Sequence, residues 1–146
     1  MDNSFTKAQR LFLEGYNCAQ SVFAANAPRF GIAEPDALKI SIGLGGGVGR
    51  LRQVCGAFSA CAMLAGLAKS STAPDRQNKE ALYAFVQKLA EDFKKRNGSI
   101  ICAELLQLQK DAPLPPTPDA RDARYYATRP CLKIVGCADV IAQSIK

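Results

Sequence analysis

The sequence predicts an all-α protein, a single-domain helical bundle of about five to six helices with a glycine-rich loop before its central helix. Apolar residues recur at steps of three and four through most of the chain, and no segment alternates polar and apolar residues as a half-buried strand does. Proline, glycine and capping residues divide these stretches into lengths typical of helices. With 146 residues, of which 48% are hydrophobic, residues 1–146 have the size and apolar content of one domain.

The first helix is expected from about Ser4 to Ala27. Leu11, Cys18 and Val22 recur there at helical spacing, and Pro28 ends the segment. This places Cys18 within the helix, on or beside its buried face.

The middle of the chain joins a glycine-rich loop to an apolar helix. A short helix is expected over Pro35–Ile42, with its proline in the first turn. Residues 43–50 then read GLGGGVGR, and five glycines in seven residues cannot form a stable helix interior. The segment Val54–Ser70 is nearly all small and apolar, which predicts the central helix of the bundle.

Three further helices are expected in the C-terminal half. Pro74 and Asp75 open the first, which ends at Asn97-Gly98, a pair typical of a left-handed C-terminal cap. A shorter helix follows from Ser99 to about Gln109. Residues 111–119 hold four prolines and are expected to form a loop. The last helix runs from Pro130 to about Ser144.

Charge and hydropathy narrow the location and the partners. The net charge is +6, but acidic residues stand among the basic ones and no nucleic-acid motif is present, so a solvated surface is favoured over a nucleic-acid site. Residues 1–7 lack a basic region followed by an apolar run, so no secretory signal is expected. The most apolar stretch, Val54–Ala68, is too short to span a membrane. We therefore expect a cytoplasmic protein without membrane insertion.

Six cysteines and no histidine narrow the chemistry further. Without histidine there is no Ser-His-Asp triad, no Cys-His pair and no imidazole metal ligand. Thiolates exchange with disulfides, hold soft metals or iron–sulfur clusters, and attack electrophiles. No CxxC is present, which excludes a thioredoxin-type site and a zinc ribbon.

Three cysteines share a setting in this map, because Cys55, Cys102 and Cys131 each stand near the start of a predicted helix. Unpaired N–H groups at a helix start favour thiolate over thiol and lower the thiol pKa. Basic residues just before two of them add positive potential: Arg50, Arg52 and Arg129. Together with Cys18, these cysteines are the candidate catalytic residues and metal ligands of one converging site.

Cys61 and Cys137 do not fit this pattern. Each follows another cysteine by six residues, a spacing that puts the two on different faces of a helix. We interpret them as small core or surface residues. The alternative for the whole set is inert core cysteines in a non-catalytic helical interaction module.

The glycine-rich loop has two interpretations. It matches neither a GxGxxG nor a Walker pattern. It is either a tight connection that lets the next helix pack closely, or a nest of backbone N–H groups that faces an anion or a thiolate-bound cluster. In the second case Gly45, Gly46, Gly47 and Arg50 bind the cofactor, or the loop is the anion cradle of an enzyme for a small ligand.

Several spaced blocks resemble one known family. The blocks are YNCAQ at 16–20, GLGGGVGR at 43–50, CGA at 55–57, GSIICAELL at 98–106, and Cys131 before a final helix. In this order they resemble the C-GCAxxG-C-C family of putative redox-active proteins, over about Phe12 to Ile141. The chain departs from the family pattern at Ala60, where the family has glycine, and at Cys61, which could be an added thiol near the site.

The resemblance implies a small bacterial protein that is redox-active or binds a cluster. The four signature cysteines of the family would fall on Cys18, Cys55, Cys102 and Cys131. A related domain occurs in split-Soret cytochromes, where an iron–sulfur site has been suggested. The resemblance supplies no substrate.

Two forms of the site are therefore expected. Four thiolates are what an iron–sulfur cluster needs, whereas a dithiol–disulfide site needs two, and the sequence slightly favours metal or cluster binding. A redox partner protein and a homodimer are also expected. The candidate apolar surface positions for such contacts are Phe30, Ile32, Leu114, Tyr125 and Tyr126.

Overall fold

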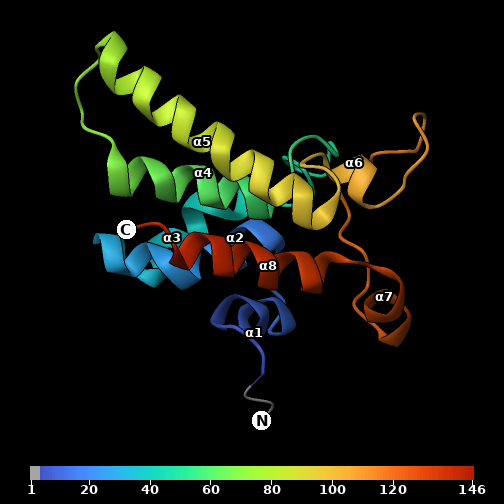
Figure 1. The fold of residues 1–146 in the computed structure, drawn as a ribbon. Coiled ribbons are helices and arrows are strands. Elements are labelled where there is room, and N and C mark those ends of the chain that lie inside the picture. The colour runs from blue at the N-terminus through green and yellow to red at the C-terminus, as the bar shows by residue number, and fades with distance from the viewer. Residues whose placement is uncertain (1–3) are drawn as a thin grey trace.

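The computed structural model describes residues 4–146, in which helices are joined by loops and the one β feature is an isolated bridge between Val54 and Ile101 (Figure 1). Residues 1–3 lie outside the described residues. They are part of the segment, residues 1–7, from which the absence of a secretory signal was expected. The helices are α1 (Lys7–Leu13), α2 (Cys18–Asn26), η1 (Ala27–Phe30), α3 (Glu34–Ser41), η2 (Ile42–Leu44), α4 (Gly56–Lys69), α5 (Arg76–Asn97), α6 (Cys102–Leu105), α7 (Ala123–Thr128) and α8 (Cys131–Gln143).

The single first helix that the sequence predicted is wrong, because the segment forms two helices. Gly15 has a φ of 114°, which ends α1 in a conformation that only glycine adopts readily. Asn17 then caps α2: its side chain accepts from the Gln20 N–H while the Gln20 side chain accepts from the Asn17 N–H. Cys18 is therefore the first residue of α2 and not a residue within a long helix.

The other predicted helices are present with shifted bounds. α5 begins after the side-chain cap of Asp75 and ends at Gly98, whose φ is 99°. The helix predicted from Ser99 to Gln109 is only the single turn of α6. α7 was not predicted; it begins where the Asp122 side chain accepts from the Tyr125 N–H.

The core is shared by α1, α2, α4, α5 and α8. The sequence placed α4 at the centre, but α2 packs against more of the fold: α1, α3, α4 and α8. α4 packs in turn against α5 and α8, and the rings of Phe58 and Phe93 meet edge to face at 5.6 Å. In Figure 1, α5 lies over α4, and both α4 and α8 begin toward the end where α6 and α7 lie.

A buried carboxylate ties three helices together. Asp139 of α8 has no exposed side-chain surface, and it accepts from the Ala8 N–H at the start of α1 (3.0 Å) and from Asn26 Nδ2 at the end of α2 (2.8 Å). Arg29 of η1 donates to the carbonyl groups of Ala142 and Ile145 at the C-terminal end of α8, both at 2.6 Å. These contacts fix the relative positions of α1, α2 and α8.

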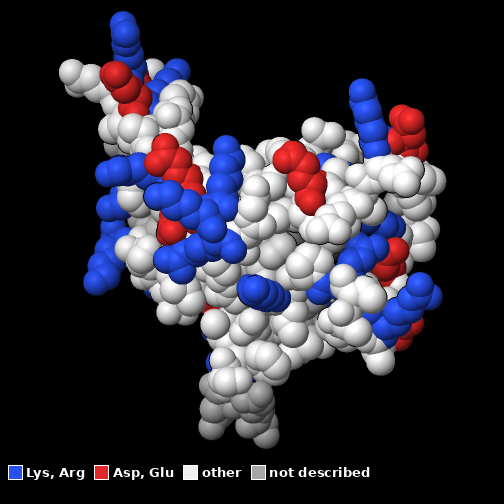
Figure 2. Space-filling model, turned by 45° about the vertical axis from the view of Figure 1, so that its right-hand side comes forward, with Lys and Arg blue, Asp and Glu red and all other residues white. Residues whose placement is uncertain are grey.

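The charged surface is mixed in sign. Figure 2 shows Lys and Arg side chains along the projecting α5 region with Asp and Glu side chains between them. Within residues 4–146, no helix is both long and apolar enough to cross a membrane. Of the apolar positions expected at a dimer surface, Leu114 is exposed and the other four are partly buried, and the homodimer stays a prediction.

Candidate functional site

A cavity of about 780 Å³ opens at the end of the fold where α2, α4, α6 and α8 begin. Its wall includes all four candidate cysteines, Cys18, Cys55, Cys102 and Cys131. Each of the four is either the first residue of a helix or, for Cys55, the residue that caps one. The volume is within the usual range of small-molecule sites.

The isolated β-bridge brings together the two helix starts that carry Cys55 and Cys102. The Cys55 N–H donates to the carbonyl of Ile100 (2.7 Å), and the Cys102 N–H donates to the carbonyl of Gln53 (2.6 Å). Because the bridge lies directly before both helices, the starts of α4 and α6 are held side by side although 47 residues separate the two cysteines.

The start of α2 is held by the polar residues of its own cap. Asn17 Nδ2 donates to the carbonyl of Ile42 (2.9 Å), and Gln20 Nε2 donates to the carbonyl of Leu38 (3.1 Å). These bonds link α2 to α3 and η2, just before the glycine-rich loop. The residues around Cys18 in the YNCAQ block therefore position the cysteine.

Gly56 allows the starts of α2 and α4 to approach. A Cβ atom at this position would lie 2.8 Å from the Cys18 Sγ atom and 2.7 Å from the carbonyl oxygen of Leu44. Real Cβ atoms essentially never come this close to other heavy atoms, so only glycine fits here without displacing the cysteine or the loop.

Cys18 and Cys55 form a hydrogen-bonded pair with opposite pKa shifts. The hydrogen bond from Cys55 is the largest effect on the Cys18 pKa; burial opposes it, and backbone N–H groups of Gly46, Ala19 and Gly56 reinforce it, so the pKa of Cys18 is about 6. The pKa of Cys55 is raised well above its usual value by the same hydrogen bond, by burial and by the charge of Cys18. The pair therefore favours one thiolate, on Cys18, beside one neutral thiol, on Cys55.

The expectation of low pKa values at Cys55, Cys102 and Cys131 is wrong. Burial raises the pKa of Cys102, against the hydrogen bond from Arg52 Nη1 (3.5 Å). Burial raises the pKa of Cys131 to about 11, against a hydrogen bond from Tyr125. For Cys102 and Cys131, loss of hydration of the buried thiolate outweighs the stabilisation that a helix start gives to it.

The glycine-rich loop forms a tight turn beside Cys18, and the binding of an anion or a cofactor by its N–H groups stays a prediction. Gly46 has a φ of 66°, and its N–H lowers the pKa of Cys18. Gly47 does not line the cavity, and a Cβ there would lie 2.6 Å from the Gln53 nitrogen, so it makes the tight turn possible. The N–H groups from Val48 to Arg50 donate to carbonyl groups of the loop and of η2. Gly45 and Arg50 line the cavity.

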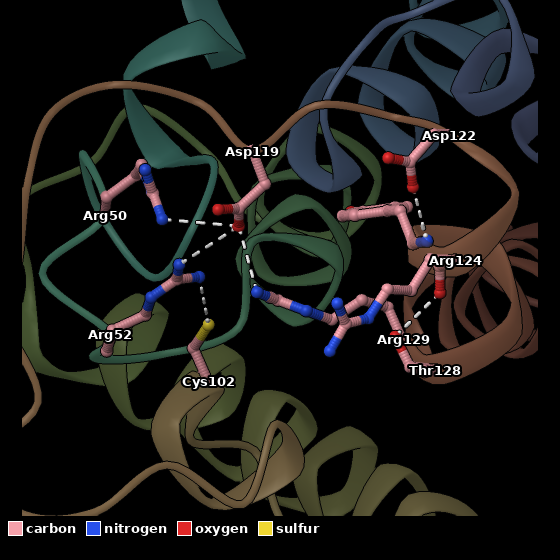
Figure 3. A network of polar contacts seen from close by, with 9 residues as sticks. Arg50, Arg52, Cys102, Asp119, Asp122, Arg124, Thr128 and Arg129 are labelled. Atoms are coloured by element: carbon pink, nitrogen blue, oxygen red, sulfur yellow. Dashed lines mark hydrogen bonds and ion pairs between the residues drawn. The ribbon is translucent and has the colours of Figure 1, made fainter.

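Three arginines meet on one carboxylate beside the cysteines (Figure 3). The Oδ2 atom of Asp119 lies 3.0 Å from Arg129 Nη2, 3.3 Å from Arg50 Nη2 and 3.8 Å from Arg52 Nη2. Sequence analysis identified the three arginines by their position before cysteines. It missed Asp119, because nothing local marks one aspartate in a proline-rich loop as their partner.

Tyr125 and Arg121 are two further cavity residues that sequence analysis did not place in the site. Tyr125 hydrogen-bonds to Cys131, and burial raises its pKa. Arg121 donates to the carbonyl groups of Phe12 and Tyr16 and lies over the Phe12 ring at 3.9 Å. It ties the segment before α7 to the end of α1.

Cys61 and Cys137 lie away from the cavity wall. Cys61 is buried in the core with its Sγ atom 3.5 Å from the carbonyl oxygen of Ala138, and burial raises its pKa to about 12. Asn97 Nδ2 lies 3.5 Å from the Cys137 Sγ atom. Their interpretation as core or surface residues fits these contacts, and Cys61 is not an added thiol of the site.

The donor set does not fit a metal or an iron–sulfur cluster as the side chains are placed. In the part of the chain that the structure describes, no three Cys, Asp, Glu or His side chains are grouped closely enough to hold a metal ion. The four thiols line one cavity, but only Cys18 and Cys55 are joined by a hydrogen bond.

Comparison with known proteins gives one match. A family model described as "Putative redox-active protein (C_GCAxxG_C_C)" matches residues 16–145. No curated protein and no solved structure matches the chain. The matched range contains all four cysteines of the cavity.

Proposed function

Because the chain belongs to the C_GCAxxG_C_C family of putative redox-active proteins, we propose that it is a dithiol–disulfide exchange protein in which Cys18 and Cys55 are the reacting pair. The observation that carries the proposal is the close approach of the two helix starts that hold these cysteines: both line one cavity, and a Cβ on Gly56, next to Cys55, would lie 2.8 Å from Cys18 Sγ. The pKa of Cys18 is lowered to about 6 and that of Cys55 is raised, each with the other cysteine as the largest cause. Such a split is what an attacking thiolate and a resolving thiol require.

The first step is attack by the Cys18 thiolate on one sulfur of a substrate disulfide. A bond forms between Cys18 Sγ and that sulfur, the substrate S–S bond breaks, and the second substrate sulfur leaves as a thiolate that takes up a proton. Backbone N–H groups of Gly46 and Gly56 hold the Cys18 thiolate before attack. Cys18 is half-buried, so the substrate sulfur reaches it through the cavity.

The second step releases the substrate. Once Cys18 carries no charge, one cause of the raised Cys55 pKa is removed, so Cys55 loses its proton more readily. Its thiolate attacks Cys18 Sγ, the mixed disulfide breaks, and the remaining substrate sulfur leaves as a thiol. The substrate disulfide gains two electrons and two protons, and Cys18 and Cys55 form a disulfide. A dithiol reductant, a redox partner protein in the cell, reverses the sequence.

Cys102 and Cys131 have supporting roles in this proposal. Both line the cavity, and the charge of Cys18 is among the causes that keep their pKa values high. As neutral thiols they do not compete with Cys18 for the substrate disulfide. No step passes through a metal or a cluster, since the thiols are not grouped to hold one.

Disulfide mapping tests the proposal. Protein purified without oxygen is treated with a mild thiol oxidant and analysed by mass spectrometry, with iron, zinc and sulfide assays on the untreated sample. We expect a colourless, metal-free protein that loses two thiols, joined as Cys18–Cys55. Cys61 and Cys137 are the internal control, because the charge of Cys137 acts on Cys61 but neither cysteine lines the cavity.

Three outcomes would contradict it. Iron and sulfide with visible absorption would support the cluster instead. A Cys61–Cys137 bond would place the chemistry elsewhere. Uniformly slow labelling of all six thiols would support the inert interaction module. The cytoplasmic location and the homodimer remain part of the proposal, and light scattering tests the second.

A further inference from the structure

The arginine cluster at the cavity is built on a strained backbone. Arg50 and Arg52 have φ values of 65° and 61°, the left-handed conformation that non-glycine residues rarely adopt. Such strain tends to persist where it places functional side chains. Here it turns both guanidinium groups toward the wall of the cavity that also holds Cys102 (Figure 3).

The cluster has more positive charge than its partner neutralises. Arg50, Arg52 and Arg129 share the single carboxylate of Asp119, and their side chains are only 17%, 12% and 25% exposed. Glu14 also lines the cavity, from the exposed end of α1. Arg121 adds a further guanidinium to the wall. Partly desolvated guanidinium groups in excess over carboxylates form a strong anion site.

Asp119 shows that a carboxylate fits the cluster. One of its oxygens is placed between three guanidinium groups, from a proline-rich loop in which its own side chain is 40% exposed. A guanidinium has five N–H donors. Arg50 and Arg129 each use one terminal nitrogen on Asp119, and Arg52 uses one on Asp119 and one on Cys102. Donors therefore remain for a second carboxylate.

We propose that this cluster binds the carboxylate of a low-molecular-weight disulfide and directs its sulfur to Cys18. The inference rests on the proposed function, and it names the substrate class. The cavity of about 780 Å³ is the size of a small-molecule site, and the cluster and the Cys18–Cys55 pair line this same cavity. A small disulfide whose carboxylate lies on the arginines is therefore held in the cavity that contains the attacking thiolate.

Two small disulfides of different charge test the proposal. The anionic probe is 5,5′-dithiobis(2-nitrobenzoate), and the neutral probe is 4,4′-dithiodipyridine; each releases a coloured thiol on exchange. Rates are measured at neutral pH for the unaltered protein and for Arg52→Gln, Arg129→Gln and Asp119→Asn. Arg96→Gln is the matched control, because it removes the same charge from the surface of α5, where Arg96 pairs with Asp92.

We expect the ratio of the exchange rate with the anionic probe to that with the neutral probe to fall about tenfold in Arg52→Gln and in Arg129→Gln. Each variant removes one charge-assisted hydrogen bond to the probe, and a loss of about tenfold is typical of such a bond. Asp119→Asn should raise this ratio, because it removes the competing carboxylate. Arg96→Gln should leave it unchanged. Added salt should lower the anionic rate of the unaltered protein and leave the neutral rate alone.

The outcomes separate the two proposals. Unchanged ratios in both arginine variants and in Asp119→Asn would overturn the anion site. Equal losses with both probes would mean that the arginines act on the thiols and not on the substrate, and would also overturn it. If the unaltered protein does not react with the neutral probe, or if Cys18→Ser reacts as fast as the unaltered protein, the proposed function is overturned instead. Circular dichroism shows whether each variant is folded, and Asp119→Asn provides the test if an arginine variant is not.

Discussion

Two pairs of neighbouring cysteines lie in contrasting surroundings in this fold. Cys18 and Cys55 are at the starts of α2 and α4, where backbone N–H groups and a thiol donor stabilise one thiolate. Cys61 and Cys137 lie within α4 and α8, and Cys61 has burial and the nearby Asp139 charge against its thiolate. A helix start alone does not explain the difference, because the pKa values of Cys102 and Cys131 are raised by burial at helix starts too. What distinguishes Cys18 is the donors around it, the Cys55 thiol first and then backbone N–H groups.

Replacing the attacking thiol should have the largest effect on this contrast. At neutral pH the thiolate fraction of a thiol with a pKa of about 6 exceeds that of Cys131, with a pKa of about 11, by roughly four orders of magnitude. Weaker nucleophilicity of the more acidic thiol offsets about two of these orders. Cys18 should therefore react with iodoacetamide about a hundredfold faster than Cys131, as followed by mass spectrometry, and Cys18→Ser should remove this fast reaction.

Cys61→Ala is the control for that experiment and should leave the fast alkylation intact. A fast-reacting thiol that survives in Cys18→Ser would show that the reactive thiolate is a different cysteine.

Asp139, whose charge acts on Cys61, tests whether the buried core around this cysteine can be destabilised without changing the reactivity of Cys18. Asp139→Ala leaves the Ala8 N–H and the Asn26 side chain without their acceptor, at about 1 kcal/mol each, so the free energy of unfolding should fall by about 2 kcal/mol. Urea denaturation measures this. Asp139→Asn keeps one acceptor oxygen and should lose less. The folded Asp139→Ala protein should retain the fast alkylation of Cys18, and its loss would show that the two regions are coupled.

The reactive pair should also show its own pH dependence. Because the folded pKa of Cys18 is lowered to about 6, its thiolate predominates above that pH and is lost as the pH falls through it. The alkylation rate at Cys18 should drop about tenfold from pH 7 to pH 5. A midpoint above pH 8 would contradict the stabilisation of the thiolate by Cys55 and Gly46.

Two glycines of α4 give the smallest expected effect. Gly56→Ala brings a Cβ against Cys18 Sγ and the Leu44 carbonyl, and should lower the free energy of unfolding by about 1 kcal/mol or more. Gly66→Ala has its nearest neighbour at 3.9 Å and should raise it by up to about 1 kcal/mol. Thermal unfolding of the two variants compares them. Equal stabilities would mean that the start of α4 does not need its close approach to α2.

Local signals in the sequence predicted most of the helices but not how they divide. The bounds of α3, α4, α5 and α8 follow proline, aspartate and glycine signals at their ends. The break at Gly15 was missed because apolar residues keep helical spacing across it. The capping pair Asn17 and Gln20 was the signal that could have revealed it.

The sequence predicted the four cysteines of the candidate site, but not their pKa values or the presence of Asp119, Arg121 and Tyr125. The four cavity cysteines were separated from Cys61 and Cys137 by their positions alone, and they do line one cavity. Their pKa values depend on burial and on one another, and neither is readable from neighbours in the sequence. Asp119 lies 67 or more residues from Arg50 and Arg52, so their contact is a product of the tertiary structure.

The β-bridge before α4 and α6 also has a consequence for the timing of assembly. It closes a loop of more than 40 residues that contains both long antiparallel helices, and such closure carries an entropic cost that must be met before the bridge is stable. The groups that lower the Cys18 pKa include Cys55 and the N–H groups of Gly46 and Gly56, which follow Cys18 in the chain by 28 or more residues. A growing chain therefore has Cys18 before it has these groups, and the thiol stays an ordinary one until the start of α4 has packed against α2.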